Sequence, residues 1–150
     1  MVNRGCVVLL GDFSSERLDV ASVVNDFGWS VAHAASLSKL AEIGRSHTVI
    51  AVLVQTWALN MPLPEALRAI RAAARRGRIL VCHKVGQAYA RTSMIDSGAF
   101  AVLLSPLAQS EVRQALGFVW ASKITPVPHI ASPARKTRMV EARAQRAGAA

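Results

Sequence analysis

The feature that most constrains the fold is an alternation of short apolar runs with stretches of helical character. The apolar runs cover residues 6–10, 29–35, 48–54, 79–82 and 100–104. Helix signals follow each run, at residues 14–27, 37–43, 62–76, 87–97 and 110–123. Short continuous apolar runs are typical of buried parallel strands, which need crossover helices between them. The pattern predicts an α/β fold, a doubly wound five-stranded parallel sheet with helices on both faces.

Capping residues set the expected ends of these helices. We expect Ser14 or Ser15 to begin the first helix, because serine side chains accept hydrogen bonds from the first turn. The same rule places Ser36 and Ser110 at the start of the second and fifth helices. Proline is favoured in the first turn, and glycine is favoured just after the last. The third helix therefore opens at Pro62 and Pro64, and the expected stops are Gly28, Gly44, Gly77 and Gly98.

Composition indicates one globular domain followed by a tail. Hydrophobic residues make up 52% of the 150 residues, which is enough for a substantial core. The run after the N-terminus is too short for a signal peptide, and no run reaches the roughly 18 apolar residues of a membrane span. We therefore expect a cytoplasmic protein with no membrane contact and with Cys6 and Cys82 reduced in the core. Residues 1–123 form the expected domain, and residues 124–150 form a proline-containing linker and basic tail.

Positive charge is concentrated in two segments of this chain, whose net charge is +9. Residues 66–95 carry seven cations and no acid, and the tail adds a second basic segment. The arginines of the third helix are spaced so that they would share one side of it. This surface is either a solvated face or a docking site for an acidic protein or nucleic acid. The predicted basic patch comprises Arg68, Arg71, Arg75, Arg78, Arg135, Lys136 and Arg138.

Three motifs give the chain a family resemblance. They are Leu10-Gly11-Asp12-Phe13-Ser14-Ser15-Glu16-Arg17, then Met61-Pro62, then Gly98-Ala99-Phe100-Ala101-Val102-Leu103-Leu104-Ser105-Pro106-Leu107. In this order and spacing they resemble the CheY-like receiver domains of bacterial response regulators over residues 5–121. The resemblance implies a flavodoxin/CheY-like sheet of strand order 2-1-3-4-5. It also implies a cis bond between Ser105 and Pro106.

The acids that receiver chemistry needs are largely missing from this chain. The family places two acids after the first strand, a phosphoacceptor aspartate at the end of the third, a serine or threonine after the fourth and a lysine before the proline. No aspartate or glutamate lies between Glu42 and Glu65, so the acceptor position has no carboxylate. Magnesium binding requires carboxylate oxygens. The resemblance therefore implies a pseudo-receiver without phosphorylation, metal, cofactor or enzymatic activity. Its degenerate pocket is formed by Gly11, Asp12, Val54, Gln55, His83, Ser105 and Pro106.

Several pocket residues have more than one interpretation. Asp12 is a relic ligand, a cap for the following helix or a salt-bridge partner of Lys84. His83 is a hydrogen-bonded strand-end residue or a switch near neutral pH. A triad of Ser105, His83 and Asp12 lacks the nucleophile elbow that hydrolases need. Gln55, together with the adjacent Thr56, is also a candidate for binding a small ligand.

The resemblance implies that partners dock on the face made by helix four, strand five and helix five. Helix five presents a core stripe of Val112, Ala115, Leu116, Val119 and Trp120. Phe118 points about 120° away from that stripe at 100° per residue, so it contacts a partner or is covered by residues 124–134. The interface candidates are Phe118, Arg113 and Arg91. We expect a regulator that acts by protein contact, as a homodimer or with a histidine kinase or other signalling protein. The alternative is a nucleic-acid-associated regulator.

Overall fold

The computed structural model describes residues 5–84 and 91–124. Its centre is a five-stranded sheet in the order β2-β1-β3-β4-β5, and every neighbouring pair of strands is parallel. The strands are β1 (Cys6–Leu10), β2 (Ser30–Ala34), β3 (Val49–Gln55), β4 (Arg78–Lys84) and β5 (Ala101–Ser105). The predicted fold class and strand order are confirmed. β3 is buried along its whole length, and β2 is a half-exposed edge strand.

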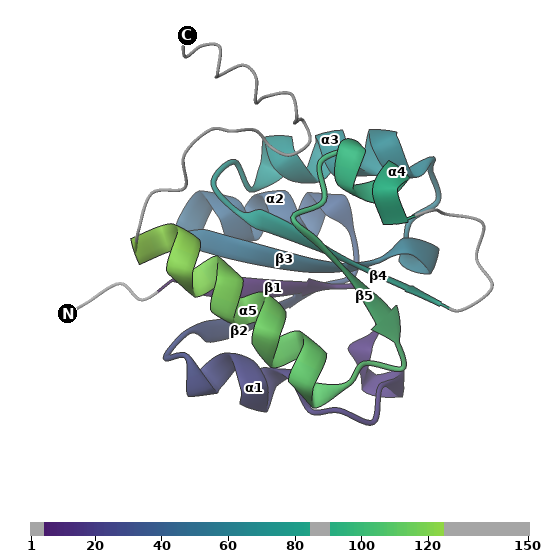
Figure 1. Ribbon diagram of the computed structural model, residues 1–150. Coiled ribbons are helices and arrows are strands. Elements are labelled where there is room, and N and C mark those ends of the chain that lie inside the picture. The colour runs from purple at the N-terminus through teal and green to yellow at the C-terminus, as the bar shows by residue number, and fades with distance from the viewer. Residues whose placement is uncertain (1–4, 85–90, 125–150) are drawn as a thin grey trace, which may run out of the picture. The chain divides into compact units, whose positions relative to one another are not determined.

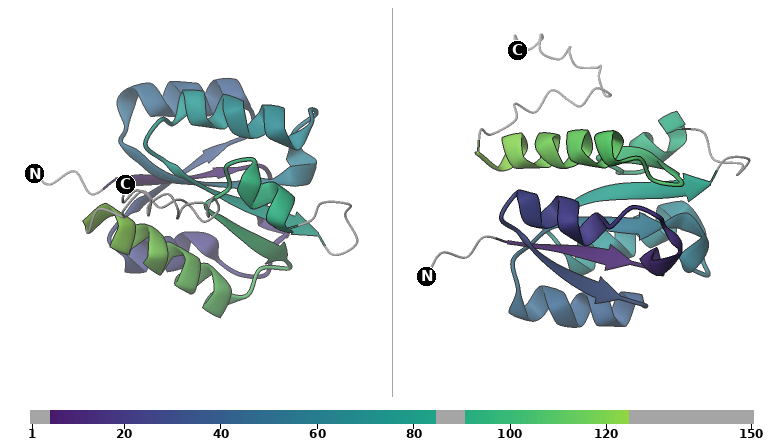
Figure 2. Two further views of the ribbon diagram at one scale, coloured as in Figure 1. Left: turned by 45° about the horizontal axis from the view of Figure 1, so that its top comes forward. Right: turned by 90° about the horizontal axis from the view of Figure 1, so that it is seen from below.

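The helices cover both faces of the sheet. They are α1 (Val20–Asp26), α2 (Leu37–Ser46), α3 (Leu63–Ala73), α4 (Arg91–Asp96) and α5 (Gln109–Ile124), with 3-10 turns η1 (Phe13–Ser15) and η2 (Thr56–Ala58). α1 and α5 lie side by side on one face, and α2, α3 and α4 lie on the other (Figures 1 and 2). No helix in the described ranges is long and apolar enough to cross a membrane.

Two apolar cores form because neighbouring residues of a strand point to opposite faces. In β1, Val8 packs with the side chains of α2 and α3, whereas Val7 and Leu9 pack with those of α1 and α5. Burying a side chain of this size stabilises the fold by about 1.5–3 kcal/mol.

The first compact unit ends at Trp120, and α5 continues from there into a second unit that begins at Ala121. The predicted linker and tail began at residue 124, but Ile124 is the last residue of α5; residues 125–150 lie outside the described residues.

The start of α1 differs from the prediction. Neither Ser14 nor Ser15 caps it, because both belong to the 3-10 turn η1. The N-cap is Asp19, whose carboxylate accepts a hydrogen bond from the Ser22 backbone N–H at 3.3 Å. Aspartate caps a helix as well as serine does. With Ser14 and Ser15 taken up by η1, the next suitable cap is Asp19, and α1 begins after it.

The ends of the other helices were predicted with mixed success. Ser36 caps α2 through the Lys39 amide, as expected, but α2 does not stop at Gly44 and continues to Ser46. α3 ends at Ala73, three residues earlier than predicted. Ser110 is not a cap either: α5 already begins at Gln109. The expected stops at Gly28 and Gly98 are confirmed. Their φ values are +82° and +117°, respectively, and such positive values favour glycine.

The core stripe of α5 excludes Trp120, contrary to the prediction. Val112, Ala115, Leu116 and Val119 are buried, whereas Trp120 is 48% exposed and Phe118 is 58% exposed. Residues two apart on a helix are about 200° apart around its axis. Phe118 and Trp120 therefore lie on opposite flanks of the buried stripe. The prediction that Phe118 points off the core is confirmed.

Candidate functional site

The carboxyl ends of the parallel strands bring the predicted pocket residues to one edge of the sheet. Strand pairing aligns Gln55 with Cys82 and His83 with Leu104, and Gly11 follows β1 directly. Ligands of doubly wound sheets bind at this edge, next to the switch in strand order. We call this set the strand-end site; it consists of Gly11, Asp12, Gln55, His83 and Ser105.

Gln55 fills the middle of the strand-end site. Its side chain is 1% exposed. Its Oε1 accepts a hydrogen bond from the Asp12 backbone N–H at 2.8 Å, and its Nε2 donates to the Asp12 backbone carbonyl at 2.9 Å. The amide thus pairs both polar backbone groups of one residue. An ionised carboxylate has no donor for the carbonyl, so it could not make the same pair of contacts.

Gly11 makes room for this amide. Its φ is +128°, a backbone conformation that residues other than glycine rarely adopt. A Cβ placed on Gly11 would collide with Oε1 of Gln55. The absence of the first acid and the presence of Gln55 are therefore one packing solution, because a side chain at position 11 and the Gln55 amide compete for the same space.

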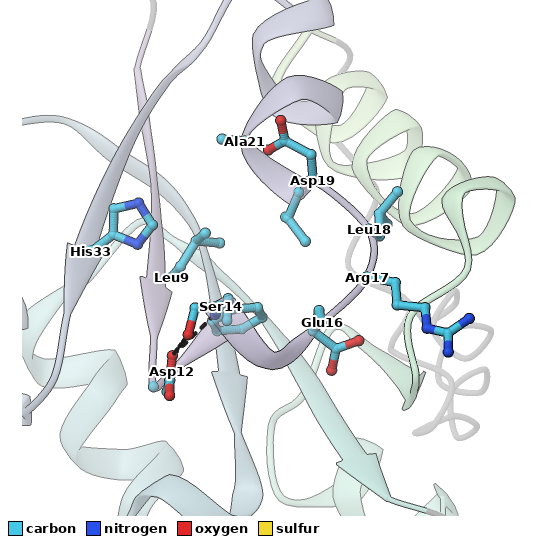
Figure 3. Close-up of a pocket in the computed structure, with 12 residues that line it drawn as sticks. Leu9, Asp12, Ser14, Glu16, Arg17, Leu18, Asp19, Ala21 and His33 are labelled. Carbon is cyan, nitrogen blue, oxygen red and sulfur yellow. Dashed lines mark hydrogen bonds between the residues drawn. The ribbon is translucent and has the colours of Figure 1, made fainter.

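The remaining carboxylate, Asp12, serves the following turn. Its Oδ1 accepts hydrogen bonds from the Ser14 hydroxyl at 2.5 Å and from the Ser14 backbone N–H at 3.1 Å (Figure 3). The hydroxyl contact, and then the backbone contact, lower the pKa of Asp12 from its ordinary value. The prediction that Asp12 is a cap is confirmed for η1. The ammonium of Lys84 lies 4.5 Å from the centre of the Trp57 ring.

Glu16 is a site residue that the sequence reasoning did not single out. Its Oε2 accepts from the Ser105 hydroxyl at 2.5 Å, and its Oε1 accepts from the Leu107 backbone N–H at 2.8 Å. These contacts tie the β1–α1 loop to the β5–α5 loop across the site. The predicted cis bond between Ser105 and Pro106 is confirmed in this loop. The sequence signal that could have pointed to this contact is Ser105, which stands where the family has a lysine.

The described contacts do not assemble a hydrolytic triad. The Ser105 hydroxyl bonds to Glu16 and the Asp12 carboxylate bonds to Ser14, so neither contact goes to His83. Nδ1 of His83 is buried and has no hydrogen-bond partner among the described residues. The expectation of a hydrogen-bonded strand-end histidine is therefore wrong for this atom.

A pocket of about 440 Å³ lies beside the strand-end site, between the β1–α1 loop and His33 of β2. The carboxylates of Asp12, Glu16 and Asp19 are spread around it and do not converge on one point (Figure 3). Within residues 5–84 and 91–124, no group of three or more histidine, cysteine, aspartate or glutamate side chains could hold a metal ion. The lining mixes apolar and polar side chains, and each of its three carboxylates accepts at least one hydrogen bond from the chain.

The predicted arginine stripe does not lie along one helix. α3 ends at Ala73, so Arg75 follows the helix and Arg78 is the first residue of β4. The guanidinium of Arg78 lies 5.3 Å from the centre of the Phe100 ring, and that of Arg71 packs where a side chain of Gly98 would be. The predicted helix continued three residues too far, to Arg76, and Arg78 lies beyond even that end. The rest of the predicted patch, Arg135, Lys136 and Arg138, lies outside the described residues, and charge alone supports a nucleic-acid role.

The face made by α4, β5 and α5 carries exposed apolar side chains. Ile95 and Leu104 are exposed together with Phe118, one from each element. The carboxylate of Asp26 on α1 pairs with Arg113 at 2.9 Å, so this interface candidate faces α1. Arg91 is the first residue of α4, and its side chain lies outside the described part of the chain.

Comparison with solved structures identifies the fold. The signal receiver domain of a protein described as a Luxo repressor, from Vibrio parahaemolyticus, matches with a TM-score of 0.67 and 15% identity, covering 81% of this chain and 94% of that one. The receiver domain of the TMAO respiratory system response regulator TorR matches with a TM-score of 0.66 and 20% identity, covering 77% and 97%. The beryllofluoride-activated NtrC4 receiver domain dimer matches with a TM-score of 0.66 and 12% identity, covering 78% of this chain and 97% of that one.

The chain has the CheY-like receiver fold. No protein-family model matches its sequence, and no curated protein does. The likeness to receiver domains is thus one of three-dimensional structure.

Proposed function

We propose that this protein is a receiver-like regulatory module that is not phosphorylated. It acts in signal transduction or transcriptional regulation through contacts with other proteins. The receiver fold supports the regulatory role. The absence of phosphorylation is supported by the two hydrogen bonds of the Gln55 amide to the Asp12 backbone, which we call the Gln55 clamp. The same proposal includes a cytoplasmic location and the lack of an enzymatic activity.

The residues of the strand-end site do not fit a magnesium ion. A hard divalent cation needs several oxygen ligands, of which carboxylates are the strongest. Asp12 is the only carboxylate of the set, and it accepts two hydrogen bonds from Ser14. Gln55 uses its amide oxygen for the Asp12 amide and turns its donor to the Asp12 carbonyl. A primary amide is a poor nucleophile, and both polar atoms of this one are hydrogen-bonded to the Asp12 backbone, so Gln55 is not a phosphoryl acceptor.

The contact surface that fits this proposal is the α4–β5–α5 face. Exposed Ile95, Leu104 and Phe118 give it apolar area, and apolar residues at the centre of an interface contribute most of its affinity. One structural neighbour was solved as a receiver domain dimer. A second copy of this chain, or a signalling protein such as a histidine kinase, is the partner we propose for this face.

Nuclear magnetic resonance with a phosphate mimic tests the proposal. The labelled protein is titrated with magnesium and beryllofluoride, and the NtrC4 receiver domain, which was solved in its beryllofluoride-activated form, is treated identically as the positive control. We expect the backbone resonances of Gly11, Asp12 and Gln55 to stay in place, because the clamp leaves no ligand for either species. Saturable shifts at these residues, or a phosphorylated species after treatment with acetyl phosphate, would contradict the proposal.

A further inference from the structure

Glu16, in the β1–α1 loop, bridges to the β5–α5 loop, where its partners Ser105 and Leu107 are 89 and 91 residues away in sequence. Ser105 is the last residue of β5, and α5 begins at Gln109, so the bridge holds the segment between them. Leu107 itself is buried against the core formed with α1 and α5. Phe13, in the same loop as Glu16, is buried in that core too. The bridge therefore joins two segments whose apolar side chains pack into one cluster.

Charge makes this bridge stronger than ordinary loop contacts. Hydrogen bonds that a carboxylate accepts are about twice as strong as those between neutral groups. Each oxygen of Glu16 has one neutral donor, and the Glu16 side chain is partly buried, which limits competition from water. The guanidinium of Arg17 lies apart from the Glu16 carboxylate (Figure 3). The two donors of the β5–α5 loop are the contacts that hold this carboxylate in place.

We propose that Glu16 is a latch, a positioning residue that fixes the β5–α5 loop on the β1–α1 loop. Because this loop connects β5 to α5, the latch also sets how these two elements present Leu104 and Phe118. The strand-end site and the α4–β5–α5 face are then coupled through a carboxylate that belongs to the chain itself. The latch goes beyond the proposed function, and it stands whether or not the strand-end site takes up a phosphoryl group.

Amide hydrogen exchange of the full chain tests the latch. Glu16→Ala removes the acceptor of the Leu107 amide, and we expect that amide to exchange about tenfold faster or more, from the usual strength of a hydrogen bond to a charged group. The matched control is Glu111→Ala, which removes an exposed carboxylate from the first turn of α5. Exchange at Val52 and Leu53 of β3 reports whether the variants keep their fold. Equal exchange of the Leu107 amide in the two variants would overturn the proposal.

The coupling to the face needs a second measurement. The methyl resonances of Ile95 and Leu104 should shift in Glu16→Ala, whereas those of the buried Leu53 should not. Glu16→Gln keeps an oxygen for the Leu107 amide and an amide group that can bond the Ser105 hydroxyl, so its resonances should return most of the way to the native positions. Ile95 and Leu104 resonances that stay unchanged in Glu16→Ala would overturn the coupling of the latch to the face.

Discussion

The Gln55 side chain packs directly against the backbone of Gly11, which has no side chain to displace it. The amide of Gln55 needs the space that a side chain at position 11 would occupy. It also supplies the donor and the acceptor that pair the Asp12 backbone. Buried backbone groups without partners are costly, so this pairing stabilises the edge of the sheet. The residues that carry this packing, Gly11 and Gln55, are the same ones on which the proposed absence of phosphorylation rests.

Gly11→Ala should destabilise the protein by about 2–4 kcal/mol, because it combines a strained positive φ with a collision against Gln55. Urea denaturation measures the change. The matched control is Gly117→Ala in α5, where an added Cβ meets nothing within 4 Å. That substitution should raise stability by about 0.5–1 kcal/mol, from helix propensity. Equal urea midpoints for the two variants would contradict this account of Gly11.

The pKa of Asp12 should respond to Ser14 and not to Ser15. The Ser14 hydroxyl donates to the Asp12 carboxylate, whereas the Ser15 hydroxyl donates to the Asp12 backbone carbonyl. A carbon-13 titration should therefore find the Asp12 pKa below its ordinary value, raised toward that value in Ser14→Ala and unchanged in Ser15→Ala. An unchanged pKa in Ser14→Ala would rule out the hydroxyl as the main cause.

The lowered pKa of Asp12 also sets the sign of a pH effect on stability. Asp12 has a lower pKa in the folded than in the unfolded protein. Its contribution to the free energy of unfolding is therefore complete above the pKa of the unfolded chain, about 4. It is lost as the pH falls through the folded pKa. The stability difference between the native protein and Asp12→Asn should hold from pH 7 to 5 and shrink on further acidification, in urea midpoints measured across that range. A difference that does not depend on pH would contradict this linkage.

The missing carboxylates could be predicted from the sequence because they depend only on which residues follow which strand. The groups that replace them could not. The contacts of Gln55 with Asp12 span 43 residues, and those of Glu16 with the β5–α5 loop span 89 and 91. Nothing in the local sequence around Glu16 marks it as the partner of a loop that far away. Such pairings become visible only once the strand order has been set.

At the scale of elements, the kinds of element and their order follow from periodicity, but their ends follow from contacts. Gly44 shows why: it resembles a helix stop in the sequence, yet α2 continues past it. A Cβ on Gly44 would collide with the backbone carbonyl of Ala73 on α3. The glycine therefore permits a close approach of α2 and α3. Only knowledge of which helices are neighbours separates this role from that of a stop.

Gly44→Ala should destabilise the protein by about 1–2 kcal/mol, although alanine is the better helix former. The collision is with backbone, which cannot rotate away, so α2 and α3 must separate. Urea denaturation next to Gly117→Ala isolates the effect, since both substitutions add the same methyl group inside a helix. A gain in stability from both substitutions would show that the contact between α2 and α3 relaxes freely.

At the scale of the whole molecule, the two flanks of α5 have different surroundings. The flank with Phe118 belongs with the exposed Ile95 and Leu104, whereas the ion pair of Arg113 with Asp26 ties the other flank to α1. Trp120 is exposed on that second flank. The chain thus carries two large aromatic side chains on one helix, of which only one lies on the proposed contact face.

Phe118→Ser should weaken self-association about tenfold or more, since a central aromatic residue of an interface typically contributes that much. Trp120→Ser is the matched control on the opposite flank and should leave the dissociation constant close to the native value. Sedimentation analysis over a range of protein concentrations measures both. A native chain that stays monomeric throughout, or equal weakening by both variants, would exclude dimerisation through the α4–β5–α5 face.

The fit between Gly11 and Gln55 also bears on reversibility. Gln55→Asp by itself would leave the backbone carbonyl of Asp12 without its donor, and the side chain of Gly11→Asp by itself would collide with the Gln55 amide. We expect each of these single steps toward a phosphoacceptor site to lower stability. Under the function proposed above, the packing of Gly11 and Gln55 therefore opposes a gain of phosphorylation by any one of these substitutions alone.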